Sequence, residues 1–390
     1  MIPRTIFQSE HDTFRDAVRR FVETEIAPHH ADWEEAGQVP REIWRKAGAA
    51  GLLCCAVPEA YGGPGADFLY NVVVIEELAR CGASGPGFAI HSDMVATYIQ
   101  NFGNEEQKRR WLPGMVAGEI IGALGITEPA AGSDVRGIRT TVRRDGDALV
   151  INGQKTYISN GQLADIVVLV CKSDPARPRD AISLVVVETD RPGFARGRRL
   201  KKLGMKAQDT SELFFDEVRV PAGNLLGEEH QGFRYLTRNL AHERLVQAVR
   251  SAVVAEVTIA QTVEYVAGRK AFGHSLAEFQ NTQFKLAELQ AAAVAARVFV
   301  DRCIELQVAG RLDEVDAAAA KLMLTELHCR VVDECLQLHG GWGYMWEYPV
   351  CRAYADARIV KIAGGAVEVM KQIIARDLFG RFGGTRRKAA

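Results

Sequence analysis

The sequence predicts an α+β protein with three domains: an N-terminal all-helical domain over residues 1–120, a β domain over 121–232 and a C-terminal helical bundle over 233–390. Two observations predict this organisation. The hydrophobic period is helical at both ends of the chain and changes to that of short strands in the middle. A chain of 390 residues also exceeds the roughly 250–300 residues at which single hydrophobic cores stop growing.

The first domain is expected to be helical because its apolar side chains recur three to four positions apart. Phe14, Val18, Phe21 and Ile26 follow this spacing, and Pro28 ends the run soon after. A connector rich in glycine and proline covers residues 57–65. Further buried helices are expected over 70–80, 88–101 and 105–117.

The middle domain is expected to be an antiparallel sheet, built as a small barrel or a sandwich. Three dipeptides separate its short apolar runs: Asp145-Gly146, Asn152-Gly153 and Asn160-Gly161. Asn-Gly and Asp-Gly between such runs are the strongest local signals for hairpins. The expected strands cover residues 139–143, 148–151, 155–159, 166–172, 181–188 and 212–215.

The last domain is expected to be an antiparallel four-helix bundle, because short loops join its long helical segments. The expected helices cover residues 233–269, 277–309, 314–338 and 349–379. The gap between the last two holds His339-Gly340-Gly341-Trp342-Gly343-Tyr344, and a plain bundle does not need such a run of glycines and aromatic residues.

Composition and missing motifs exclude several classes of function. The net charge of −1 argues against a nucleic-acid partner, and no apolar stretch approaches the roughly 20 residues of a membrane helix. The eight cysteines form no C-x-x-C pair and no zinc spacing, so we expect buried thiols and no metal. Without a signal peptide pattern, a cytoplasmic location is expected. Rossmann, P-loop and G-x-S-x-G motifs are also missing.

Five segments, in order along the chain, resemble the acyl-CoA dehydrogenase family, and the likeness runs from about residue 14 to 379. They are residues 58–63, 126–135, 152–161, 269–273 and 337–341. Residues 206–210 and 338–349 resemble the long-chain acyl-CoA dehydrogenase subgroup in particular. The resemblance implies a middle antiparallel β-barrel between a helical domain and a four-helix bundle. It also implies FAD, an acyl-CoA substrate, electron-transferring flavoprotein as acceptor and a homotetramer built as a dimer of dimers.

The expected reaction is α,β-dehydrogenation of the thioester to a trans-2-enoyl-CoA, a step of fatty acid β-oxidation. It needs a base for the α-proton and stabilisation of the thioester oxygen. Most of the family carries its base in a Tyr-Glu-Gly-Thr run, where this chain has Ala363-Gly364-Gly365-Ala366. The long-chain and isovaleryl subgroups instead carry it in a Glu-Arg-Leu context, which begins here at Glu243. The resemblance therefore assigns Glu243 as the base, and the Gly364 N–H as a donor to the thioester carbonyl.

The resemblance also implies two sets of binding residues. The FAD residues are Leu124, Gly125, Ile126, Thr127, Gly132, Ser133, Tyr157, Ile158, Ser159, Arg269, Gln280, Gln337, Leu338, His339, Gly340, Gly341, Ala366, Val367 and Glu368. Those up to Ser159 should form the wall and rim around the isoalloxazine. Arg269, Gln280 and residues 337–341 should reach the FAD of a neighbouring subunit, with Arg269 on the pyrophosphate. The substrate residues are Ser133, Arg234, Ala241, His242, Arg244, Gly364 and Gly365.

Each assignment has a structural alternative. Glu243 would otherwise be an ordinary surface glutamate, Arg244 a member of a structural ion pair, Tyr157 a core aromatic and Glu368 a solvated helix residue. The exchange of the family's tyrosine and threonine for Ala363 and Ala366 leaves the acyl chain open, and a branched or terpenoid chain would fit a widened pocket. Two rival functions are a flavin oxidase or monooxygenase that uses O2, and a non-catalytic acyl-CoA-binding assembly.

Overall fold

The computed structural model describes residues 2–174, 177 and 181–382, and it divides into two compact units. The first unit consists of Met1–Asp12, Ile75–Gly82 and Leu240–Ala390, and the second of Thr13–Val74 and Ala83–Asn239. The second unit therefore joins most of the N-terminal helices to the sheet. No described helix is long and apolar enough to cross a membrane.

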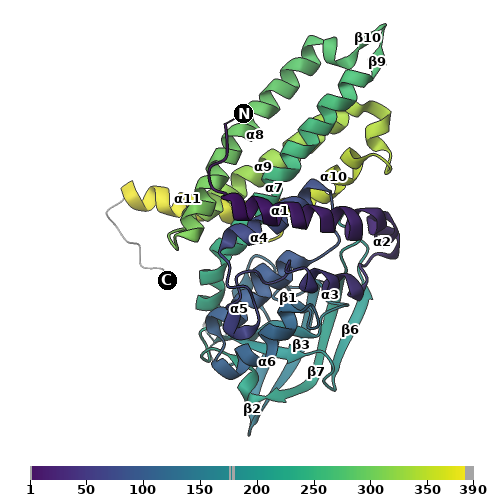
Figure 1. Ribbon diagram of the computed structural model, residues 1–390. Helices are drawn as coiled ribbons and strands as arrows, with labels where there is room; N and C mark the ends of the chain where they lie inside the picture. Colours follow the sequence, from purple (N-terminus) through teal and green to yellow (C-terminus); the bar gives the residue numbers. More distant parts are fainter. Residues whose placement is uncertain (1, 175–176, 178–180, 383–390) are drawn as a thin grey trace. The chain divides into compact units, whose positions relative to one another are not determined.

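The N-terminal helices are short, and one of them, α6, starts at a side-chain cap that the sequence supplies. At α6, Asn104 and Gln107 form a capping box in which each side chain accepts the other's backbone N–H at 2.9 Å. The elements are α1 (Ser9–Phe21), η1 (Val22–Ile26), η2 (Ala27–His29), α2 (His30–Ala36), α3 (Arg41–Ala49), η3 (Glu59–Tyr61), α4 (Phe68–Arg80), η4 (Ile90–Val95), α5 (Ala96–Phe102) and α6 (Glu105–Val116). The helix expected over 88–101 is thus a π-helical turn, η4, followed by α5 (Figure 1).

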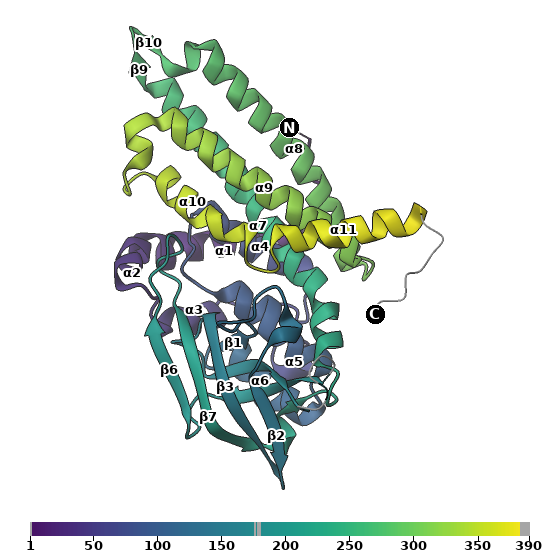
Figure 2. The same ribbon diagram turned by 180° about the vertical axis from the view of Figure 1, so that it is seen from behind.

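The sheet has the order β6-β7-β3-β2-β4-β5-β8, and β1 pairs with β4 (Figure 2). Its strands are β1 (Gly122–Gly125), β2 (Thr141–Asp145), β3 (Ala148–Ser159), β4 (Ile166–Lys172), β5 (Ile182–Glu188), β6 (Phe194–Arg199), β7 (Thr210–Pro221) and β8 (Leu225–Leu226), with η5 (Val135–Gly137) and η6 (Ala222–Asn224) between them. The pairs are antiparallel, apart from the parallel contacts of β4 with β1 and β2. The closure of this sheet into a barrel, which the family resemblance implies, stays a prediction.

The three Asn/Asp-Gly signals of this region had different outcomes, and Asn160-Gly161 forms a turn after β3. Asp145-Gly146 makes the β2–β3 hairpin, with Gly146 at a φ of +62°. Asn152-Gly153, which was expected to separate two strands, lies inside β3 instead, so that prediction was wrong. Gly153 has a φ of +146°, and the register with β7 shifts between Ile151 and Gly153. The dipeptide marks a bulge, the other role of glycine within a strand.

The first unit is built on three long helices, α7 (Gly232–Gly268), α8 (Gln280–Val308) and α9 (Glu314–His339). The remaining elements are β9 (Lys270–Ala271), β10 (His274–Ser275), η7 (Leu276–Glu278), η8 (Gly340–Tyr344), α10 (Pro349–Ala357), η9 (Arg358–Lys361) and α11 (Val367–Phe382). The single helix expected over 349–379 is wrong, because Gly364 and Gly365, at φ of +67° and +92°, turn the chain between η9 and α11. Ile259, Leu289, Val331 and Val350 belong to one core cluster, so α7, α8, α9 and α10 share a core.

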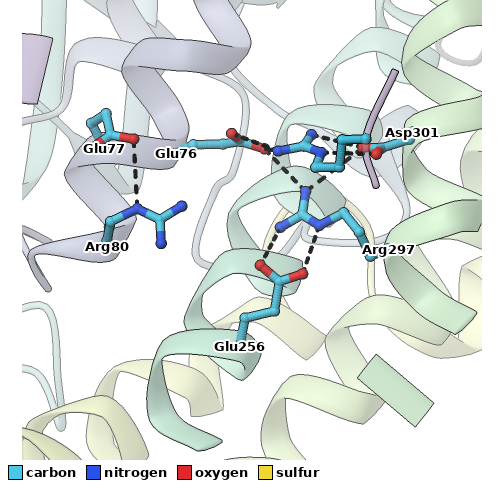
Figure 3. Close-up of polar contacts among 7 residues, drawn as sticks. Glu76, Glu77, Arg80, Glu256, Arg297 and Asp301 are labelled. Carbon is cyan, nitrogen blue, oxygen red and sulfur yellow. Dashed lines mark hydrogen bonds and ion pairs between the residues drawn. The ribbon is translucent and has the colours of Figure 1, made fainter. Parts of the chain in front are cut away.

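A network of five charged side chains also ties this unit together, and we call it the arginine network (Figure 3). Arg297 Nε and Nη2 donate to the two carboxylate oxygens of Glu256 at 2.7 and 2.8 Å, and its Nη1 donates to Glu76 at 3.0 Å. Arg4 bonds Glu76 at 2.9 Å and Asp301 at 2.7 Å. Such paired bonds compensate the desolvation of the fully buried Glu76.

Candidate active site

In the second unit, the loop that follows β1 is fastened to β3. Lys155 on β3 donates through Nζ to the Ile126 carbonyl at 3.1 Å and to Glu128 Oε1 at 2.7 Å. The Thr156 N–H donates to the Thr127 carbonyl at 2.9 Å. These bonds hold the loop over 126–128 beside the strand that carries Tyr157, so two of the sequence-predicted segments come together.

The anchor of this loop is a buried ion pair. The side chains of Lys155 and Glu128 are 0% and 4% exposed. Burial alone would raise the pKa of Glu128, but Lys155 and the hydrogen bond from the Thr140 N–H, at 3.0 Å, lower it. The Arg139 N–H also donates to this carboxylate, at 2.5 Å. Glu128 is therefore a carboxylate with a fixed position, and the loop it holds is rigid at its start.

Among the predicted FAD residues on β1, on β3 and in the loop after β1, some are exposed and others are buried. Tyr157 is 68% exposed, which excludes a core aromatic, and its φ of +59° is rare for a bulky residue. Such strain persists only where the surrounding structure imposes it, and it clusters at ligand sites. Gly132 and Ser133 are exposed, Leu124 is half-buried, and Ile158 is buried in the sheet core. Ile158 therefore has only its backbone to offer a ligand.

In the first unit, Glu243 lies on α7 with only 4% of its surface exposed, so it is not a surface glutamate. Gln247 follows it one helical turn later on the same face. A Cβ added to Gly364 would lie 3.6 Å from Gln247 Cγ. The glycine turn thus packs against the stretch of α7 that carries Glu243. The structure brings together the two positions at which the sequence predicts catalytic groups.

The neighbours of Glu243 on α7 are also enclosed. Arg244 is 3% exposed, and its Nη1 lies 3.2 Å from Glu314 Oε1, so it makes the structural ion pair that was its alternative role. Burial lowers the pKa of His242 to about 4, which keeps its imidazole neutral near pH 7. Ala241 is half-buried, and Arg234 is exposed in the part of α7 that belongs to the second unit.

A groove of ≈ 510 Å³ in the first unit collects six of the predicted FAD residues, Arg269 and residues 337–341. Tyr265 forms part of its wall. The Tyr265 and His339 rings stack with centroids 4.1 Å apart, and the Tyr265 hydroxyl donates to the His339 carbonyl at 3.2 Å. The Arg269 N–H donates to the Tyr265 carbonyl at 2.9 Å. These contacts fasten the end of α7 to the end of α9, and Arg269 lies exposed directly after α7.

The groove can hold an anionic, planar group. Arg269 offers a guanidinium suited to a pyrophosphate, and added Cβ atoms at Gly340 and Gly341 would meet nothing within 4 Å, so their backbone is open to a ligand. Sequence reasoning missed the groove residues Tyr265, Leu276, Trp342 and Met345, although Trp342 and Met345 lie in the segment 338–349 that resembles the long-chain subgroup.

The other predicted FAD residues lie outside that groove. Gln280 is exposed at the first position of α8, and it is not among the groove's lining residues. Ala366 is half-buried beside the start of α11, and Val367 is buried at its first position. Glu368 is exposed, as expected of a solvated helix residue.

Three family models match the chain. They are the N-terminal domain of acyl-CoA dehydrogenase over residues 8–119, the middle domain over 123–218 and the C-terminal domain over 230–379. Together they span most of the 390 residues.

Individual proteins match over almost the whole chain. The long-chain specific acyl-CoA dehydrogenase, mitochondrial, of Sus scrofa is 49% identical over 377 residues, which are 96% of this chain and 88% of that protein. A crystal structure of acyl-CoA dehydrogenase from Geobacillus kaustophilus is 49% identical with a TM-score of 0.95, covering 96% of this chain and 100% of that one. A structure described as electron transferring flavoprotein of Acidaminococcus fermentans is 33% identical with a TM-score of 0.91, covering 95% and 98%.

Proposed function

This chain belongs to the acyl-CoA dehydrogenase family, as its motifs predicted, and we propose that it oxidises a long-chain or branched acyl-CoA to the trans-2-enoyl-CoA. The observation that carries the proposal is the buried Glu243 on α7, with a glycine in place of the usual glutamate packed one turn away. A chain that had merely lost its base would have no reason to bury a carboxyl group at this point.

In the proposed reaction, Glu243 takes the α-proton of the thioester. Its burial keeps bulk water away from the carboxylate, so the proton is taken in a dry site. The Gly364 N–H donates to the thioester oxygen as negative charge develops there. Loss of the β-hydrogen with its electron pair then completes the double bond between the α- and β-carbons. FAD, when bound, accepts that hydrogen and both electrons.

The residues present fit FAD. Arg269 and the open glycines of the groove suit the pyrophosphate, and the apolar and aromatic side chains around them suit the adenosine end. Tyr157 on β3, together with Gly132 and Ser133 in the loop between β1 and η5, is exposed and available for the isoalloxazine. As the family resemblance implies, we propose that FAD is shared between subunits of a homotetramer.

The wider assignments follow from the same proposal. Electron-transferring flavoprotein is the proposed acceptor, and the proposed domain boundaries remain 1–120, 121–232 and 233–390.

The eight cysteines are free thiols, five of them buried, which favours the reducing cytoplasm. The two alanines beside the glycine turn favour an acyl group wider than a straight chain.

The test is anaerobic flavin bleaching. The purified protein, reconstituted with FAD if necessary, is mixed with a straight long-chain acyl-CoA and, separately, with a branched one. We expect the visible flavin absorbance to fall with either substrate, and the enoyl-CoA to form in equal amount. A protein that binds FAD but keeps its colour with every acyl-CoA would contradict the dehydrogenase assignment.

A further inference from the structure

Lys321 is a fully buried lysine on α9 that neither the motifs nor the reaction above uses. Its Nζ donates to the Gly365 carbonyl at 2.5 Å. Burying an ammonium group costs free energy, and an apolar side chain of similar volume often serves a core as well or better. The surrounding stretch of α9, from Ala317 to Leu324, is rich in alanine and leucine and would accept such a replacement. The lysine therefore has a purpose other than packing.

The carbonyl to which this buried lysine donates belongs to the glycine turn. Gly364 and Gly365 both have left-handed φ angles. They lie between the last backbone hydrogen bonds of η9 and the first backbone hydrogen bonds of α11. Two consecutive glycines give the backbone its greatest freedom. A turn of this kind needs an external anchor if one of its N–H groups is to keep a fixed direction.

We propose that Lys321 is a positioning residue for the reaction: its bond to the Gly365 carbonyl holds the glycine turn so that the Gly364 N–H is aimed at the thioester oxygen. This inference rests on the proposed function. Lys321 does not touch the substrate in this account, and it acts only through the backbone of the turn.

The charges around Lys321 agree with this role. Arg244 from α7 and Glu368 from α11 act on it with opposite signs, and burial lowers its pKa to about 8. Lys321 is therefore charged at neutral pH, and a charged donor makes a stronger bond to a carbonyl than a neutral one. Three elements, α7, α9 and α11, meet around this bond.

A purely structural role is the rival explanation. Under that alternative, Lys321 only fixes the start of α11, and its loss lowers the melting temperature without changing how the substrate carbonyl is polarised. The two explanations differ in the stretching frequency of the thioester carbonyl, because a hydrogen bond to that oxygen lowers the frequency. An acyl-CoA labelled with ¹³C at the carbonyl makes this band visible in the infrared spectrum of the complex.

The test compares the Lys321→Met variant with wild type and with Lys371→Met, which removes an exposed lysine from α11. We expect Lys321→Met to bleach about 10- to 100-fold more slowly at saturating acyl-CoA, the size expected when an oxyanion donor is misplaced. The affinity for acyl-CoA and the flavin content should stay near wild type, and the carbonyl band should move to higher frequency. Lys371→Met should match wild type in all four measurements.

A wild-type bleaching rate and carbonyl band in Lys321→Met would overturn the positioning role. If that variant does not fold, Lys321→Gln replaces it. The glutamine is one bond too short to reach Gly365, so the same slowing and the same band shift are expected, and their absence again overturns the role. Wild-type protein that fails to bleach with any acyl-CoA would instead overturn the proposed function, so the two failures are distinguishable.

Discussion

Position 243 lies on α7 and position 364 packs against the same stretch of that helix, but the two backbones differ greatly in stiffness. Glu243 lies inside a helix of 37 residues, whose successive hydrogen bonds fix the direction of each side chain. Gly364 lies in a turn of two left-handed glycines. A helix can hold a carboxylate in place by itself, whereas the turn offers only its own N–H and needs Lys321 to aim it. The difference indicates why the base and the oxyanion donor come from different elements.

The largest expected effect tests the helix side of this comparison. Replacing Glu243 by Gln keeps the size of the side chain but removes the base, so we expect bleaching by acyl-CoA to slow by at least ~10²–10⁴-fold. The flavin content should not change. Glu264→Gln, an exposed position on the same helix, is the matched control and should behave as wild type. Near-normal flavin reduction in Glu243→Gln would remove Glu243 from the mechanism.

A second variant tests the binding of the cofactor instead of the two catalytic positions, 243 and 364. Arg269→Glu places a negative charge where the pyrophosphate is expected, so flavin binding should weaken by about 10- to 100-fold and the oligomer should loosen. Lys270→Glu makes the same change at the next residue, which does not line the groove. Flavin content is measured after gel filtration, and oligomeric state by light scattering. Equal flavin content in both variants would mean that the groove does not hold FAD.

The turn side of the comparison predicts a smaller effect. Gly364→Ala forces an L-residue into a left-handed φ of +67°, which costs about 1–2 kcal/mol of stability. Gly310→Ala meets the same strain at +66° in the loop between α8 and α9, where a Cβ has open space around it. Both variants should therefore melt at a similarly lowered temperature, but only Gly364→Ala should also bleach more slowly. Equal bleaching rates would show that the turn contributes stability alone.

A last effect, on stability and not on the rate, limits the pH range in which these rates can be compared. Burial lowers the pKa of His91 to about 4, below its unfolded value near 6.5. Its Nε2 lies 3.0 Å from the Met115 carbonyl, and its Nδ1 accepts the Gly122 N–H at 3.1 Å, which only a neutral ring can do. The unfolded chain therefore binds the extra proton between pH 6.5 and 4, so stability falls as pH falls through this window.

At pH 5 the loss from His91 should be about 2 kcal/mol relative to pH 7. His91→Gln has no such titration and should lose correspondingly less. Urea unfolding of both proteins at the two pH values measures the difference. An identical pH dependence in the variant would show that another group causes the acid loss.

Much of the fold followed from periodicity, but local exceptions did not. The three long helices of the first unit lie within a few residues of their predicted ranges, because long helical segments joined by short loops are the strongest signals that a sequence carries. The bulge at Asn152-Gly153 and the turn at Gly364-Gly365 were missed for one reason. Glycine permits several backbone conformations, and only long-range pairing decides among them.

The site was predictable where a motif marked it. Residues 337–341 with Arg269 were expected together and share one groove. Lys321 was not expected, since a lysine in a helical sequence is usually solvated, although the four alanines before it and the apolar residues 322–324 after it are typical of a buried stretch. The role of Lys155 was not expected either, because its position in a strand does not indicate its bond to Glu128, 27 residues away in the sequence. Such long-range polar pairs leave no periodic trace.

The claim that positions 243 and 364 face one α-carbon has a direct test, the transfer of the base from helix to turn. The measurement is anaerobic bleaching by a short and a long acyl-CoA in Glu243→Gly alone and in Glu243→Gly combined with Gly364→Glu. The account predicts that the double variant recovers part of the lost rate and stays about 10²-fold below wild type, because the new side chain grows from a strained backbone and is slightly misplaced. A double variant as inert as Glu243→Gly with both substrates would contradict the claim that Gly364 faces the thioester.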